Sequence, residues 1–150
     1  MHRHSAYHWS GRNEEAGSTN VTGLLMYYYL TGNERAWDVI QEVGGFLLSD
    51  PVTYAQHSDI APVRTLGNVL WGDVLMYQAT RDARYQQGAQ KWARVLIEGQ
   101  REDGTWLETY NPRDRLWAGR VKNNYITFYV LQALIAYHRL TGDEAAAQAI

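Results

Sequence analysis

The segment LLMYYYLTGNERA, residues 24–36, decides the fold, because it joins an aromatic-rich run to a second run through a tight Thr-Gly-Asn turn. Similar segments follow at residues 74–85 (VLMYQATRDARY) and 134–144 (LIAYHRLTGDE). When the three are aligned, Thr31, Thr80 and Thr141 fall at the same position. The repetition predicts three copies of one helix–turn–helix unit.

The centre of each unit has the residues that end one helix and begin the next. Gly32 and Gly142 can adopt the left-handed conformation that closes a helix. Asn33, Asp82 and Asp143 can then cap the following helix. A connection this short predicts two antiparallel helices, a helical hairpin.

Apolar residues recur at helical spacing on both sides of each turn. The predicted helices span residues 18–31, 33–48, 63–80, 82–100, 122–141 and 143–150. We therefore expect a single all-α domain over 1–150, made of three antiparallel helical hairpins. The long segment 101–121 can hold a small β-hairpin.

The composition excludes several classes of protein. The 150 residues include no cysteine, which rules out a disulfide framework, a thiolate nucleophile and a Cys-ligated zinc site. A formal net charge of −2 argues against a nucleic-acid partner. No apolar run is long enough for a membrane span, and the first residues lack the apolar stretch of a signal peptide.

The aromatic residues are of an unusual kind, with 11 Tyr and 6 Trp against 2 Phe. Tyr and Trp have a polar group and suit surfaces that are half apolar and half wet. Hairpin geometry puts the long segments 1–17, 49–62 and 101–121 at one end of the helices, and long loops often carry function. Four of the five histidines fall in these segments.

This end can form a cleft for a sugar polymer, with rings that stack on sugars and arginines that pair with uronate carboxylates. The candidate substrate-binding residues are Trp9, His57, Arg64, Trp106, Tyr110, Arg120 and Asn123. In the alternative interpretation, the loops are simply polar and the Trp rings close the end of the helical layer.

The densest cluster of reactive residues is HRHSAYHW, residues 2–9. His4 and His8 can transfer protons near neutral pH. Their spacing is not that of a zinc site, and no cysteine or carboxylate completes one, so we expect no metal. The cluster can also be purely structural or exposed to solvent.

Cations, amides and a phenol meet where the fifth predicted helix begins, in RVKNNY, residues 120–125. A helix N-terminus favours anions. Tyr125 beside these cations can lose its proton more easily, so it joins His4 and His8 as a catalytic candidate. His138, near a short turn at the opposite end, is expected to be structural.

Asp73 is the acid that breaks an apolar stripe, between Leu70 and Tyr77. A lone carboxylate on such a face is costly unless it has a partner. We expect that partner to be Trp71 or a neighbouring Tyr hydroxyl.

The repeated turn, the QREDGTW segment at residues 100–106 and the hairpin spacing resemble the (α/α) toroid, or six-hairpin glycosidase-like, superfamily. The HRHSAYHW entry and the GLLMYYYLTG helix at residues 23–32 most resemble the toroid domain of exo-rhamnogalacturonan lyase and YetA-like proteins. The resemblance implies an arc or partial toroid, about half of a closed one. The rest of the toroid, or self-association, would then cover exposed helix faces.

The resemblance also implies an enzyme that acts on acidic polysaccharide at the long-loop end, with no cofactor. Toroid lyases commonly use His or Tyr for proton transfer and Asn, Arg or His to neutralise the uronate. Matched by residue type, these roles suggest His4, His8, Tyr125, Arg120 and Asn123 here.

Three functions stay open at this point. The first is a polysaccharide lyase that works by β-elimination. The second is a glycoside hydrolase, which needs two facing carboxylates. Its candidates are Glu14, Glu15, Asp59, Asp103 and Glu108. The third is a non-catalytic helical-repeat or sugar-binding module.

Overall fold

The computed structural model describes residues 17, 21–54, 61–122 and 125–150 of the chain. The helices are α1 (Thr22–Thr31), α2 (Glu34–Leu48), α3 (Pro51–Tyr54), α4 (Val63–Thr80), α5 (Ala83–Glu98), α6 (Tyr125–Thr141) and α7 (Glu144–Gln148). The strands are β1 (Ala61–Pro62), β2 (Trp106–Asn111) and β3 (Leu116–Lys122).

The predicted helical hairpins are confirmed as α1–α2, α4–α5 and α6–α7, with ends that differ from the prediction by a few residues. The β-hairpin predicted in residues 101–121 is also confirmed. The predicted, mainly helical fold is confirmed, but one strand was not predicted: β1 joins this hairpin and makes a three-stranded antiparallel sheet, with Ala61 opposite Tyr110. In this sheet, backbone N–H and C=O groups from the two long connections form hydrogen bonds with one another.

The three turns repeat one hydrogen-bond pattern. The Thr31 hydroxyl donates to the Tyr27 carbonyl oxygen (2.7 Å) and accepts from the Asn33 N–H (3.2 Å). Thr80 and Thr141 make the same two bonds, each with the residues four before and two after it. The aligned threonines therefore mark the same structural position in each hairpin.

The next two positions of each turn complete the pattern. The residues after the threonines, Gly32, Arg81 and Gly142, have left-handed backbone with φ of 65°, 61° and 71°. The side chains that follow accept hydrogen bonds from N–H groups in the first turn of the next helix, which confirms the predicted caps: Asn33, Asp82 and Asp143.

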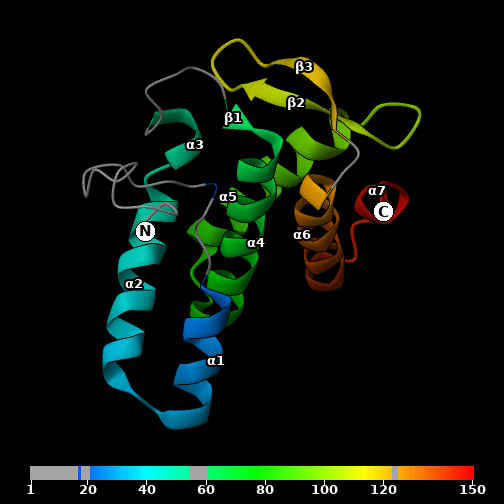
Figure 1. Cartoon of the computed structure of the whole chain (residues 1–150). Coiled ribbons are helices and arrows are strands. Elements are labelled where there is room, and N and C mark those ends of the chain that lie inside the picture. Colours follow the sequence, from blue (N-terminus) through cyan, green and yellow to red (C-terminus); the bar gives the residue numbers. More distant parts are fainter. Residues whose placement is uncertain (1–16, 18–20, 55–60, 123–124) are drawn as a thin grey trace.

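Helix α4 lies at the centre of the core. It packs against α5, α6 and α2, and buried residues occur around most of its circumference. Gly67 allows α6 to come close, because a Cβ there would lie 2.9 Å from the carbonyl carbon and oxygen of Tyr129. The hairpin α1–α2 lies on one side of α4, and α6 with α7 lies on the other (Figure 1).

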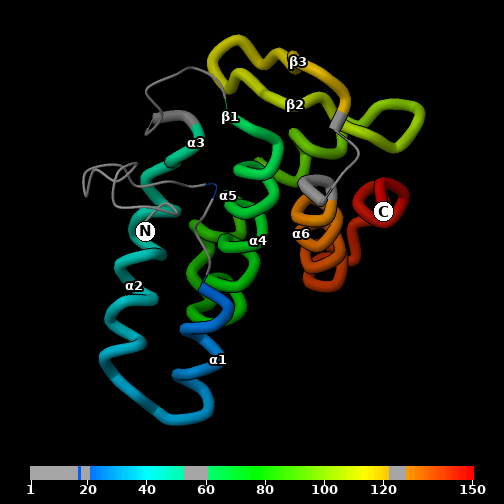
Figure 2. The backbone as a smooth tube through the Cα atoms, in the orientation of Figure 1, coloured from blue at the N-terminus to red at the C-terminus, as the bar shows by residue number. Residues whose placement is uncertain are grey.

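The elements of the long connections lie together at one end of the helices. Figure 1 shows α3 and the sheet at the top, and the α1–α2 turn at the bottom. The tube in Figure 2 follows α1 down to that turn and α2 back up toward α3. We call the end with α3 and the three strands the sheet end. The described parts of segments 49–62 and 101–121 thus lie at one end, as predicted.

Candidate functional site

Several predicted site residues lie outside the described residues. These are His4, His8, Trp9, His57 and Asn123. Tyr125 is the first residue of α6, and only its backbone is described. The proton-transfer roles assigned to these residues therefore stay predictions.

Two predicted substrate-binding aromatics are core residues of the sheet end. Trp106 is only 1 % exposed, and its indole N–H donates to the Leu96 carbonyl oxygen at 2.7 Å. Tyr110 is also buried, with its ring centroid 5.1 Å from that of Trp117, and burial raises the pKa of the Tyr110 hydroxyl. Neither ring offers a free face to a sugar. Their placement agrees with the interpretation in which aromatic rings close the end of the helical layer.

The predicted arginines do lie at the sheet end. Arg64 is half-buried in the first turn of α4, directly after β1. Arg120 is exposed on β3, and Arg115 is exposed at the β2–β3 turn, where its φ is 57°. This end therefore presents cationic side chains from more than one connection.

Gly17 shows where the N-terminal segment meets the helices. Its carbonyl oxygen accepts a hydrogen bond from the buried Asn68 amide at 2.6 Å. A Cβ on Gly17 would lie 2.8 Å from the Thr65 hydroxyl and 3.4 Å from the Arg64 guanidinium. Gly17, the last residue of segment 1–17, is thus fixed against the sheet end of α4.

The two hydrolase candidates among the described residues, Asp103 and Glu108, show no feature of a catalytic carboxylate pair. Asp103 accepts hydrogen bonds from the Thr105 hydroxyl (2.6 Å) and the Thr105 N–H (3.2 Å). These two bonds, together with the nearby Arg101 guanidinium, lower the pKa of Asp103. A general acid needs the opposite shift. Glu108 lies on β2 beside Gly119. Glu14, Glu15 and Asp59 lie outside the described residues.

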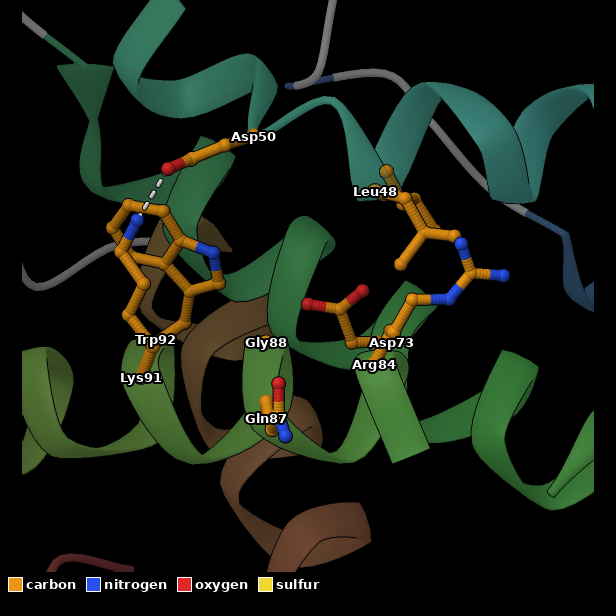
Figure 3. Close-up of a pocket in the computed structure, with 9 residues that line it drawn as sticks. Leu48, Asp50, Asp73, Arg84, Gln87, Gly88, Lys91 and Trp92 are labelled. Atoms are coloured by element: carbon orange, nitrogen blue, oxygen red, sulfur yellow. Dashed lines mark hydrogen bonds and ion pairs between the residues drawn. The ribbon is translucent and has the colours of Figure 1, made fainter. Parts of the chain in front are cut away.

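A second candidate site is a cavity of about 200 Å³ among α2, α4 and α5 (Figure 3). We call it the Asp73 cavity. It is lined by Leu47, Leu48, Asp50, Asp73, Arg84, Gln87, Gly88, Lys91 and Trp92.

Asp73 is 2 % exposed, and Figure 3 shows its carboxyl group pointing into the cavity. The expected partner, Trp71 or a Tyr hydroxyl, is not present, because no hydrogen bond or ion pair joins Asp73 to another described residue. Burial raises the pKa of Asp73 to about 8, Asp50 raises this pKa further and Lys91 opposes the rise. The side chain is therefore mostly a neutral acid at pH 7.

The cations on the cavity wall already have partners. The Lys91 ammonium forms an ion pair with Asp50 and lies 4.3 Å from the centroid of the Trp92 ring. The Arg84 guanidinium binds Asp82 at 2.6 Å. Neither cation neutralises Asp73.

The sequence indicated this site through Asp73, an acid that interrupts an apolar stripe. Asp50 and Lys91 carried no such signal, because they are polar residues 41 positions apart in the sequence, and only the packing of the end of α2 against α5 brings them together. Gly88 was missed for the same reason: it faces the Asp73 carboxyl, and a Cβ there would overlap Asp73 Oδ2.

His138 confirms its predicted structural role, since its Nδ1 lies 2.9 Å from the Asp143 carbonyl oxygen at the α6–α7 turn. In the described ranges, no three His, Asp or Glu side chains gather as a metal-binding group. No helix in the same ranges has the length and apolar character to cross a membrane.

No protein-family model, curated protein or solved structure compared with the chain matches it. Function is therefore inferred from the residues and their arrangement.

Proposed function

We propose that the chain is part of a carbohydrate-active (α/α) toroid whose sheet end binds uronate-containing polysaccharide and cleaves it by β-elimination. The helix pattern supports an arc of two layers, with α1, α4 and α6 inside and α2, α5 and α7 outside. Helix α4 buries residues around most of its circumference, as an inner helix would. Helix α5 buries one stripe, which includes Tyr85, Trp92 and Leu96, and exposes charged residues elsewhere, as an outer helix would.

The exposed surface of α1 also supports a larger assembly. Met26, Tyr27, Tyr29 and Leu30 are exposed, and Leu30 has 83 % of its surface open to solvent. A helix that is apolar on most faces is normally buried. Further hairpins of the toroid, or self-association, would cover this helix.

The position of Gly17 carries the assignment of the site. Its hydrogen bond with Asn68 fixes this residue at the sheet end, where Arg120 is exposed. Gly17 is the last residue of segment 1–17, which contains the predicted histidines, and its position at this end supports the proposal.

The proposed chemistry assigns a role to each group. A base removes the proton beside the uronate carboxylate, and a cation or amide stabilises the charge that develops. We assign proton transfer to His4, His8 or Tyr125, and charge neutralisation to Arg120 with Asn123. Arg64, Trp9 and His57 would hold neighbouring sugars. The enclosed rings of Trp106 and Tyr110 support the floor of the site rather than stacking on substrate.

The assignment is tested by incubating the protein with polygalacturonate, rhamnogalacturonan and ulvan while measuring ultraviolet absorbance and reducing ends. A lyase yields an absorbing unsaturated product for each new reducing end. Reducing ends without absorbance indicate a hydrolase. A protein that binds the polymer but produces neither signal is a sugar-binding module, and the lyase assignment is then wrong.

Arg120 provides a sharper test of the same site. Arg120→Ala is expected to lower kcat/KM by roughly 10- to 100-fold, because a charge-assisted hydrogen bond to a carboxylate contributes about 1.5–3 kcal/mol. Arg139→Ala is the matched control, since Arg139 is an exposed cation in the last turn of α6, at the opposite end. Equal losses in the two variants would contradict a specific site at the sheet end.

A further inference from the structure

The Asp73 cavity is built around a buried acid that lacks a partner. Asp73 is almost wholly enclosed, makes no hydrogen bond or ion pair with the described residues, and points into the cavity (Figure 3). A buried polar group of this kind destabilises the fold when it is left without a hydrogen-bond partner. Gly88 keeps the space open, because any side chain there would overlap the carboxyl group.

Among the described residues, the cavity wall has no cation that pairs with Asp73. Lys91 is paired with Asp50, and Arg84 is paired with Asp82, so both cations are already neutralised. The second carboxylate oxygen of Asp50, Oδ1, is buried and has no hydrogen-bond partner. The wall therefore offers unused acceptors and no unused cation, which disfavours an anionic ligand.

The shape of the cavity limits the ligand to a small molecule. Its volume of about 200 Å³ is too small for a sugar polymer. Leu47, Leu48 and Trp92 supply apolar wall for an aliphatic chain. We propose that the Asp73 cavity binds a small alkylammonium compound, whose cation pairs with the Asp73 carboxylate while its alkyl chain lies against Leu47, Leu48 and Trp92.

The proposal predicts a specific pH dependence. The charged and titratable groups that face Asp73 are Asp50 after α2, with Arg84, Tyr85 and Lys91 on α5. Because burial raises the pKa of Asp73 to about 8, the acid must lose a proton before it can pair with an ammonium group. Affinity should therefore rise about tenfold per pH unit as pH approaches 8 and level off above it, with proton release on binding.

The test is a titration of the protein with butylammonium chloride, followed by the NMR shifts of the Gly88 amide and the Trp92 indole. Butanol is the neutral ligand of the same shape. Asp73→Asn should weaken butylammonium binding at least tenfold, while Asp38→Asn, which removes an exposed acid on α2, should leave it unchanged.

If Asp73→Asn folds poorly, the same titration of the original protein at several pH values tests the proposal without a variant. Saturable shifts with butylammonium that strengthen from pH 6 to pH 8, and weaker shifts with butanol, would support the proposal. Equal binding of butanol or equal affinity at all pH values would show that the Asp73 carboxylate does not hold the cation, and no saturable shift would show that the cavity holds only water. Each of these results would overturn the proposal. None of the residues assigned to polysaccharide binding lines this cavity, so the outcome does not depend on polysaccharide activity.

Discussion

Asp73 shows how far a single residue can be interpreted from sequence. Its place on an apolar stripe predicted a buried carboxyl group, and the structure confirms the burial. The predicted hydrogen-bond partner was wrong, because α5 faces Asp73 with Gly88 rather than with a donor. A contact of this kind depends on helix packing, which residue spacing alone does not specify.

The raised pKa of Asp73 predicts how stability changes with pH. The folded protein keeps the Asp73 proton up to about pH 8, whereas an unfolded Asp loses it near pH 4. The stability due to this proton is fully present below the unfolded pKa and is lost as pH rises through the folded one. Each unit in that window removes roughly 1.4 kcal/mol from the free energy of unfolding.

The Asp73→Asn variant has no acid to titrate at this position, so its free energy of unfolding should not show this loss. The difference between the variant and the original protein should therefore shift in favour of the variant by about 1.4 kcal/mol per pH unit between pH 5 and 8. Urea unfolding of both proteins at several pH values measures the difference. A difference that does not change with pH would mean that Asp73 is ionised in the folded protein.

Arg81 has left-handed backbone, where the equivalent residues of the other two turns are glycines. This conformation costs a residue with a Cβ about 1 kcal/mol. Arg81→Gly should therefore raise the free energy of unfolding by up to about 1 kcal/mol, less the weak contribution of the Arg81 contact with the Tyr77 ring. Gly142→Arg, the reverse change in the third turn, should lower it by about the same amount. Thermal or urea unfolding that moves both variants in one direction would contradict this account of the turns.

At the scale of elements, the helical hairpins could be predicted because their signals are local. Thr31, Gly32 and Asn33 lie next to one another in sequence, and each makes the contact that its chemistry favours. The pairing of Ala61 with Tyr110 could not be predicted, because it joins connections 49 residues apart and β1 is only two residues long. Short strands carry little periodic signal.

The close contact of α4 with α6 depends on Gly67. Gly67→Ala should destabilise the fold by about 1–3 kcal/mol, because the added methyl group meets the Tyr129 backbone, which cannot rotate away. Gly45→Ala is the control, since a Cβ on this α2 residue meets nothing within 4 Å. It should stabilise the protein by about 0.5–1 kcal/mol through helix propensity. Equal effects in urea unfolding would show that α4 and α6 are not tightly packed at this point.

At the scale of the whole molecule, the hairpins present their long connections at one end, and this arrangement underlies the proposed function. Arg64, Arg115 and Arg120 lie there, and Gly17 accepts a hydrogen bond from Asn68 of α4 near the same end. Sequence reasoning predicted this grouping, because antiparallel helices joined by short turns alternate their ends. It did not establish that Trp106 and Tyr110 are enclosed, because the burial of a ring depends on what packs over it.

The central claim, that the sheet end binds an acidic polysaccharide, is tested most directly by affinity electrophoresis in gels that contain polygalacturonate or the same polymer with its carboxylates reduced. The acidic polymer should retard the protein, the reduced polymer should retard it much less, and Arg120→Ala should weaken the retardation while Arg139→Ala does not. Equal mobility of the protein in both gels, or equal retardation of the two variants, would contradict the claim.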